Sequence, residues 1–118
     1  MLFRSATYER ALHEIKQGRK TTHWMWFVFP QLRGLGRSDT SHFYGISDVD
    51  EARAYLAHPI LGPRLIEITT ALLALDTRDA TEIFGTPDDL KLRSCATLFA
   101  EISPSDSVFH RLLERFFP

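Results

Sequence analysis

The sequence predicts an all-α protein: a compact single-domain bundle of five to six helices with a long ordered loop after the first helices. Three observations lead to this prediction. Apolar residues recur at helical spacing in several segments. Explicit start and stop signals separate these segments. The 118 residues amount to one domain, 1–118, and no repeat, low-complexity tract or interdomain linker interrupts them.

The first predicted helix begins near Tyr8. Apolar side chains at Tyr8, Ala11, Leu12 and Ile15 form one face of a helix, because residues three and four apart lie on the same side. Gly18 follows as a C-terminal stop. These residues predict a short amphipathic helix.

The next segment is crowded with aromatic residues. Nearly every residue from 24 to 29 is apolar, so periodicity does not distinguish a helix from a buried strand. An N-cap at Thr21 or Thr22 favours a helix, whereas the β-branched and aromatic content favours a strand. We prefer one or two helical turns, ended by Pro30. Residues 31–45 then indicate a long ordered loop, and loops of this length are often functional.

Five further segments begin with recognisable helix-start patterns. Hydroxyl or carboxylate side chains cap the first turn, proline fits that turn, and acidic residues favour its positive end. The patterns are Ser47 with Asp50, Pro63, Asp79 with Glu82, Thr86-Pro87-Asp88-Asp89, and Ser103-Pro104. His58-Pro59 closes the first of these segments, and Gly85 closes the short third one.

Three of these segments carry apolar faces. The positions are Leu65, Ile68, Leu72 and Leu75, widened by Ile66 and Leu73; Leu92, Cys95, Ala96 and Phe99, continued by Ile102; and Phe109, Leu112, Leu113 and Phe116. The face after Pro63 is the broadest, so we expect that helix to be the central one.

Composition excludes several classes of protein. Fourteen basic and fifteen acidic residues give a net charge of -1, so we expect no nucleic-acid partner and no membrane partner. The single cysteine, Cys95, excludes an internal disulfide and a multi-cysteine zinc site and fits a reducing compartment. No apolar run approaches the ~20 residues that cross a bilayer. We therefore expect a cytoplasmic protein.

Four strings carry a resemblance to a known family. They are GRKTTHWMWFVFPQLRGLGRS, FYGI, EARAYLAHPILGPRL and IFGTPDDLKLRSCATLF. Over roughly residues 8–118 the chain resembles a bacterial family known as domain of unknown function 1810, for which the string His-Trp-Met-Trp-Phe-x-Phe-Pro-Gln is specific. The resemblance implies a mainly helical fold, and it implies no established activity, cofactor or catalytic residue.

The same resemblance implies differences at the ends of the chain. Other members have a further N-terminal helix and additional C-terminal residues, so we expect this chain to be truncated at both ends. Its first five residues, MLFRS, match the translation of a common sequencing-library adapter, and we interpret residues 1–5 as non-native.

A glycine-rich basic turn is the first candidate site. In Gly34-Leu35-Gly36-Arg37-Ser38 the glycines let backbone amides converge on an anion, the Arg37 guanidinium binds it through two bonds, and the Ser38 hydroxyl adds a donor. The spacing is neither that of a P-loop nor that of a dinucleotide fingerprint. A purely structural turn is the alternative.

His23 and the two tryptophans beside it form the second candidate. His23 suits proton transfer, Trp24 or Trp26 offers a stacking face for a flat ligand, and Gln31 with Tyr44 would complete a polar rim. In the alternative interpretation the tryptophans belong to the core and His23 is a buried hydrogen-bonding residue.

Charged residues of the Thr86 helix form the third candidate. Lys91 could support an anion site, although a solvated helix face is the usual explanation of such charges. Asp89 and Arg93 have the spacing of an ordinary surface ion pair. The scattered histidines predict no metal site, a serine–histidine–aspartate triad drawn from Ser38, His42 and Asp39 is weak, and Cys95 is expected to be an inert core thiol.

Two hypotheses about function follow from these candidates. The first is anion binding: a phosphate-bearing, nucleotide-like flat molecule is held by Arg37, Ser38 and Lys91, with transferase or hydrolase activity as its enzymatic form, and no cofactor is expected. The alternative is a non-catalytic protein-interaction module whose aromatic block is structural core or a docking groove. The sequence does not determine the oligomeric state.

Overall fold

A computed structural model describes residues 5–31 and 46–118 of the protein. Within these residues seven helices form and no β-strand does. The helices are α1 (Ser5–Lys16), α2 (Met25–Val28), α4 (Val49–Ala57), α5 (Leu61–Leu73), α6 (Ala80–Phe84), α7 (Asp88–Glu101) and α8 (Val108–Phe116). The predicted all-α class is confirmed. The number exceeds the five to six expected because the short segments α2 and α6 both complete a helical turn.

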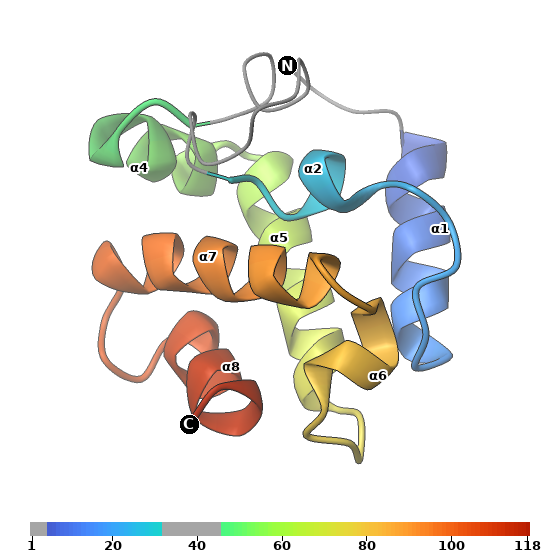
Figure 1. The fold of residues 1–118 in the computed structure, drawn as a ribbon. Coiled ribbons are helices and arrows are strands. Elements are labelled where there is room, and N and C mark those ends of the chain that lie inside the picture. Colours follow the sequence, from blue (N-terminus) through green and yellow to red (C-terminus); the bar gives the residue numbers. More distant parts are fainter. Residues whose placement is uncertain (1–4, 32–45) are drawn as a thin grey trace.

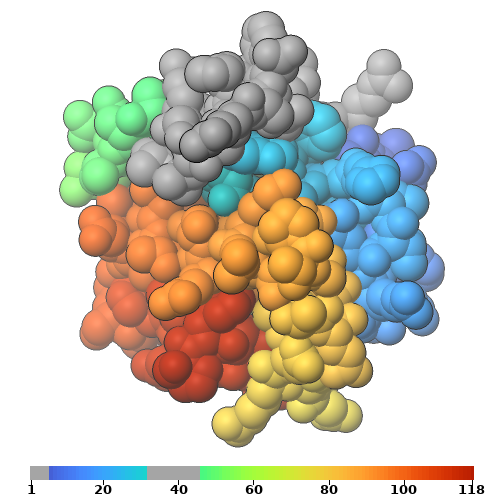
Figure 2. All heavy atoms as spheres, viewed as in Figure 1, coloured from blue at the N-terminus to red at the C-terminus, as the bar shows by residue number. Residues whose placement is uncertain are grey.

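Helix α5 passes through the middle of the bundle (Figure 1). It packs against α1, α4 and α8, while α7 packs against α8, α6 and α4. In the space-filling view α7 lies on the near face, with the blue N-terminal part of the chain to its right and α8 below it (Figure 2). The prediction of a central helix after Pro63 is confirmed.

The predicted apolar faces form the core. All four stripe residues of α1 are buried, and Gly18 ends that helix with a φ of +81°. The buried stripes of α5, α7 and α8 are Leu65, Ile68 and Leu72; Leu92, Cys95, Ala96 and Phe99; and Phe109, Leu112 and Phe116. Ile66 is an exception to the predicted face, since 42% of it is exposed.

Two helices begin later than predicted. Asp48 rather than Ser47 caps α4, because its carboxylate accepts a hydrogen bond of 2.8 Å from the Glu51 N–H. Ser107 rather than Ser103 caps α8. In both places a second side chain that can cap a helix follows the predicted one.

The start of α6 follows the prediction and that of α7 departs from it by one residue. The Asp79 side chain caps α6 by accepting from two backbone N–H groups, and Gly85 ends the helix with a φ of +72°. Pro87 itself occupies the N-cap position of α7, so the helix begins at Asp88 and Thr86 is not its cap. The acidic first turn of α7 is as predicted.

Gln31 and Ile46 flank residues 32–45, which lie outside the described part of the chain. The Ile46 N–H donates to the Gln31 carbonyl at 2.6 Å, so these two residues lie side by side. The loop predicted over residues 31–45 therefore stays a prediction. Only Gln31 of this loop lies in the described part of the chain. None of the helices in residues 5–31 and 46–118 has the length and apolar content needed to cross a lipid bilayer.

Candidate functional site

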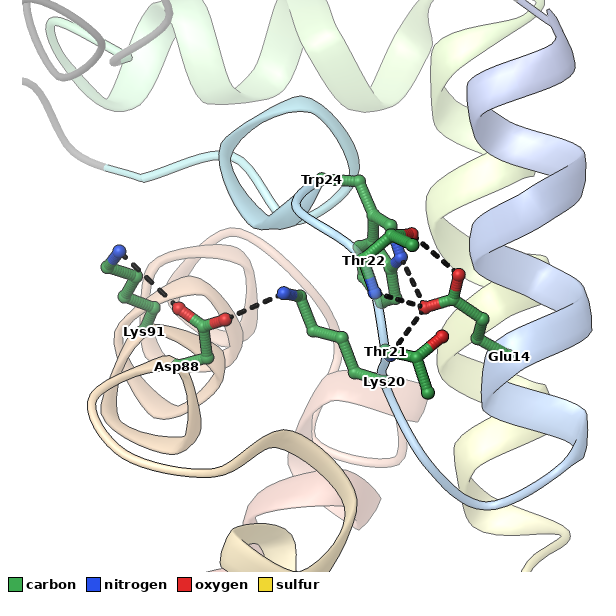
Figure 3. A network of polar contacts seen from close by, with 7 residues as sticks. All are labelled: Glu14, Lys20, Thr21, Thr22, Trp24, Asp88 and Lys91. Atoms are coloured by element: carbon green, nitrogen blue, oxygen red, sulfur yellow. Dashed lines mark hydrogen bonds and ion pairs between the residues drawn. The ribbon is translucent and has the colours of Figure 1, made fainter.

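A buried carboxylate on α1 fixes the chain that leads into α2. Glu14 is only 6% exposed, and its Oε1 accepts hydrogen bonds from the Thr21 N–H at 2.7 Å, the Thr22 N–H at 3.0 Å and the Trp24 Nε1–H at 2.9 Å. Its Oε2 accepts a fourth, at 2.6 Å, from the Thr22 hydroxyl (Figure 3). Residues 21–24 are thus held on one anchor.

This anchoring corrects the prediction that Thr21 or Thr22 caps α2. The N-cap residue of α2 is Trp24, which makes no side-chain capping bond. The two threonines donate to Glu14 instead, Thr21 through its backbone N–H and Thr22 through its backbone N–H and its hydroxyl.

The four hydrogen bonds also keep Glu14 ionised. Burial by itself raises the pKa of a carboxyl group. The bonds from the Thr22 hydroxyl, the Thr21 amide, the Trp24 indole and the Thr22 amide outweigh it and lower the pKa of Glu14 to about 2. The carboxylate is therefore charged at neutral pH, and its role is structural.

A pocket of about 190 Å³ lies beside this anchor, between α2 and the first turn of α7. Its lining residues are Lys20, His23, Trp24, Met25, Trp26, Phe27, Asp88 and Lys91. Four residues predicted from the sequence, His23, Trp24, Trp26 and Lys91, thus come together at one place. We call this cavity the Trp26 pocket.

Two lysines converge on one carboxylate in the Trp26 pocket (Figure 3). The Lys20 Nζ lies 2.9 Å from Asp88 Oδ2, and the Lys91 Nζ lies 3.4 Å from Asp88 Oδ1. Asp88 is the first residue of α7, where the positive end of the helix favours an acidic side chain. The lining therefore carries two ammonium groups against one carboxylate.

The two tryptophans occupy different environments. Trp24 is 1% exposed, donates to Glu14 and packs against Phe29 and Phe84, with ring centroids 6.2 and 6.4 Å away. Trp26 is half-buried, and the Lys91 Nζ lies 5.9 Å from its ring centroid. Of the two indoles, Trp26 has the more accessible ring.

His23 and Gln31 also lie in different environments. His23 is exposed at the edge of the Trp26 pocket. Gln31 is 2% exposed and does not line this pocket; its side-chain amide donates to the Phe29 carbonyl at 3.0 Å and to the Lys91 carbonyl at 2.8 Å. Gln31 thus ties the end of α2 to α7 beneath the pocket and is not at its rim.

Three predicted site residues, Arg37, Ser38 and Tyr44, lie outside the described residues. The glycine-rich turn that contains Arg37 and Ser38 lies there as well. Its role in binding an anion stays a prediction, and so does the role of Tyr44.

Sequence reasoning missed Lys20 and Asp88 as pocket residues. The pattern around Asp88 indicates a helix start and no pocket, and Lys20 belongs to no motif. The pairing arises because the backbone N–H of Lys20 donates to the Ile83 carbonyl at 2.7 Å, which places the lysine against α6 and the start of α7.

The remaining chemical candidates belong to the scaffold. Asp89 is buried and accepts hydrogen bonds from the hydroxyls of Thr81 at 2.6 Å and Thr86 at 3.3 Å, so the predicted pair with Arg93 does not form. Cys95 is 2% exposed, and burial raises the pKa of its thiol, as expected of a core residue. Among the described residues no three potential metal ligands cluster.

A second hollow, of about 740 Å³, runs between α4 and α7. Val49 and Leu90, which are 38% and 55% exposed, give it an apolar character. Arg93 and Glu101 are among its polar lining residues. His23, Trp24, Trp26, Gln31 and Lys91, the predicted site residues in the described part of the chain, do not line it.

Comparisons with known proteins agree with this fold. A family model described as "Protein of unknown function (DUF1810)" matches residues 3–118. The chain is also similar to the solved structure of the conserved hypothetical protein Rv1873 from Mycobacterium tuberculosis, with 50% sequence identity and a TM-score of 0.92 over 96% of this chain and 81% of that one. No curated protein matches the sequence. Neither description names a ligand.

Proposed function

Since the chain belongs to the DUF1810 family, whose description assigns no activity, we propose from the Trp26 pocket that this protein binds a small anionic molecule with a flat group. In this proposal Lys91 binds the anion, Trp26 stacks on the flat group, and His23 lies at the edge of the pocket within reach of the bound molecule.

The charge balance of the pocket is the observation that carries the proposal. Lys20 and Lys91 share the single carboxylate of Asp88, which leaves one positive charge in excess among the described lining residues. The same corner lies at the first turn of α7, where the helix dipole adds partial positive charge. A carboxylate or phosphate is the group that such a corner attracts.

The size of the pocket limits the ligand. Its volume of about 190 Å³ corresponds to roughly six water molecules at ~30 Å³ each. One phosphate or carboxylate with a single ring fills this space. A nucleotide would place its phosphate or its base here and extend the rest of the molecule beyond the described lining.

A reaction would need a group that moves protons. His23 lines the pocket, and an imidazole changes its charge near neutral pH more readily than any other side chain. In the enzymatic form of the proposal, His23 acts as general acid or base in transfer or hydrolysis of the anionic group, and Tyr44 is the second predicted participant.

A thermal-shift screen tests the binding proposal. The probes are inorganic phosphate, benzoate and nucleoside monophosphates, all at constant ionic strength. A ligand at a hundredfold excess over its Kd stabilises the folded state by about 2.7 kcal/mol, which raises the Tm of a domain of this size by roughly 10 °C.

Two variants and a control locate the site. Lys91→Gln removes the proposed anion-binding charge, and Arg37→Ala tests the predicted contribution of the glycine-rich turn. Lys16→Gln, at an exposed position of α1, makes the same charge change elsewhere. We expect Lys91→Gln to abolish the shift and Lys16→Gln to preserve it. A shift that survives Lys91→Gln contradicts the placement of the ligand, and a protein that responds to none of the probes favours the interaction-module hypothesis.

A further inference from the structure

The two ion pairs of Asp88 are not equivalent. The pair with Lys20 is the shorter one, at 2.9 Å, and the Lys20 side chain is only 6% exposed. The pair with Lys91 is 3.4 Å long, and a third of the Lys91 side chain, 33%, is exposed. One carboxylate thus holds a buried lysine on one oxygen and an accessible lysine on the other.

The pair between Lys20 and Asp88 has a structural role. The backbone N–H of Lys20 donates to α6, and its Nζ lies 5.1 Å from the Trp24 ring centroid, so the side chain is enclosed by other groups. Breaking a buried ion pair leaves a desolvated charge without compensation, which is strongly unfavourable. Asp88 is therefore held more firmly by Lys20 than by Lys91.

The pair between Lys91 and Asp88 is exchangeable. Both residues lie on α7, three positions apart, and ion pairs of this kind near the surface contribute little to stability. The lysine ammonium is a compact charge on a flexible four-carbon stem, so it can turn from one acceptor to another. An anion from solution can therefore displace Asp88 from Lys91.

We infer that Asp88 is an internal competitor for the ligand of the Trp26 pocket. It pairs with Lys91 in the free protein, and the incoming anion takes Lys91 from it while Asp88 stays bound to Lys20. Asp88 is thus a residue that sets affinity: it repels every anion that enters, and only anions that bind Lys91 better than a neighbouring carboxylate does are retained. This inference rests on the proposed function.

Removing the charge of Asp88 should therefore strengthen anion binding. In Asp88→Asn the side-chain carbonyl still accepts a hydrogen bond from Lys20, but the negative charge next to Lys91 is gone. Because partly exposed ion pairs change an equilibrium constant by up to about fivefold, we expect the Kd to fall by up to roughly fivefold. Asp106→Asn, at an exposed position between α7 and α8, makes the same charge change away from the pocket and should leave the Kd unchanged.

The experiment is a titration of the full chain with inorganic phosphate at constant ionic strength, followed by the NMR signal of the Trp26 indole N–H. Circular dichroism establishes that each variant is folded. If Asp88→Asn does not fold, the double variant Lys20→Gln with Asp88→Asn removes both buried charges together and takes its place. A Kd that falls in either variant, and rises again when Lys91→Gln is added, supports the inference.

The failures of the two proposals are distinguishable. If phosphate binds the wild type through Lys91 and the charge-removing variant binds it equally well or more weakly, the competitor role of Asp88 is overturned and the proposed function stands. Tighter binding that persists after Lys91→Gln is added also overturns the inference. If phosphate binds neither the wild type nor the variant, the proposed anion site fails and the inference fails with it.

Discussion

Replacing Glu14 by glutamine tests how the wall of the pocket is built. Glutamine has the same shape, so its oxygen can still accept from Thr21, Thr22 and Trp24, and its nitrogen can donate to the Thr22 hydroxyl. What the substitution removes is the negative charge on which four hydrogen bonds converge. The expected loss of stability is therefore the difference between a charged acceptor and a neutral one.

The pKa of Glu14 and the number of its hydrogen bonds give the same magnitude for this loss of stability. A carboxyl group with a pKa of about 2 in the folded protein, against 4.5 in a solvated glutamate, has its ionised form stabilised by about 3 kcal/mol. Independently, a hydrogen bond to a charged group contributes about 1 kcal/mol more than a neutral one, and Oε1 accepts three of them. We expect Glu14→Gln to lower the free energy of unfolding by about 3 kcal/mol at pH 7.

The effect has a defined pH dependence. Because the pKa of Glu14 is lower in the folded protein than in the unfolded chain, its contribution is complete above pH 4.5 and is lost as the pH falls towards 2. The difference between wild type and Glu14→Gln should thus shrink from about 3 kcal/mol at pH 7 to about 1.5 kcal/mol at pH 3.

Urea unfolding followed by circular dichroism at both pH values measures this difference. Glu9→Gln, at an exposed position of the same helix, is the matched control and should change stability by less than about 0.5 kcal/mol. A loss below about 1 kcal/mol at pH 7, or a loss that does not shrink at pH 3, would refute the assignment of Glu14 as a charged anchor.

Three further predictions concern the scaffold. Gly62→Ala should cost about 3 kcal/mol in urea unfolding, because its Cβ would lie 2.0 Å from the Leu56 carbonyl oxygen, whereas Gly18→Ala, with open space and a φ of +81° at the end of α1, should cost only about 1 kcal/mol; equal costs would contradict this. Thr69→Val should raise the free energy of unfolding by about 1 kcal/mol, since the buried Thr69 hydroxyl has no hydrogen-bond partner among the described residues. A lower free energy of unfolding would contradict this, because it would mean that the hydroxyl makes a stabilising hydrogen bond. Cys95, which is buried with a raised pKa, should react with a thiol-specific disulfide reagent only as fast as the protein unfolds, and fast labelling of the native protein would be inconsistent with that burial.

Local patterns determined most of the helices. The stripe on α1 and the capping by Asp79 and Gly85 around α6 follow from residues within one or two turns of each other, and the structure confirms them. Where two neighbouring side chains could cap, as at Ser47 and Asp48, the sequence offered no means of choosing, because both satisfy the same local geometry.

The pocket was predicted in part. His23, Trp24, Trp26 and Lys91 do line one cavity, although residue type alone could not show that Trp24 is buried. The sequence shows the same residue whether a tryptophan lines a site or lies in the core. Only its neighbours, here Glu14, Phe29 and Phe84, distinguish the two roles.

The sequence by itself thus determined the helical class, the core faces and the family, because these depend on spacing along the chain and on recognisable strings of residues. Only the tertiary structure decided that Lys20 and Lys91 share Asp88, and that Gln31 ties α2 to the backbone of Lys91, 60 positions away. Such contacts join residues that no local pattern relates. They form because helices that each bury an apolar face have to pack together, and that packing brings their polar ends into contact.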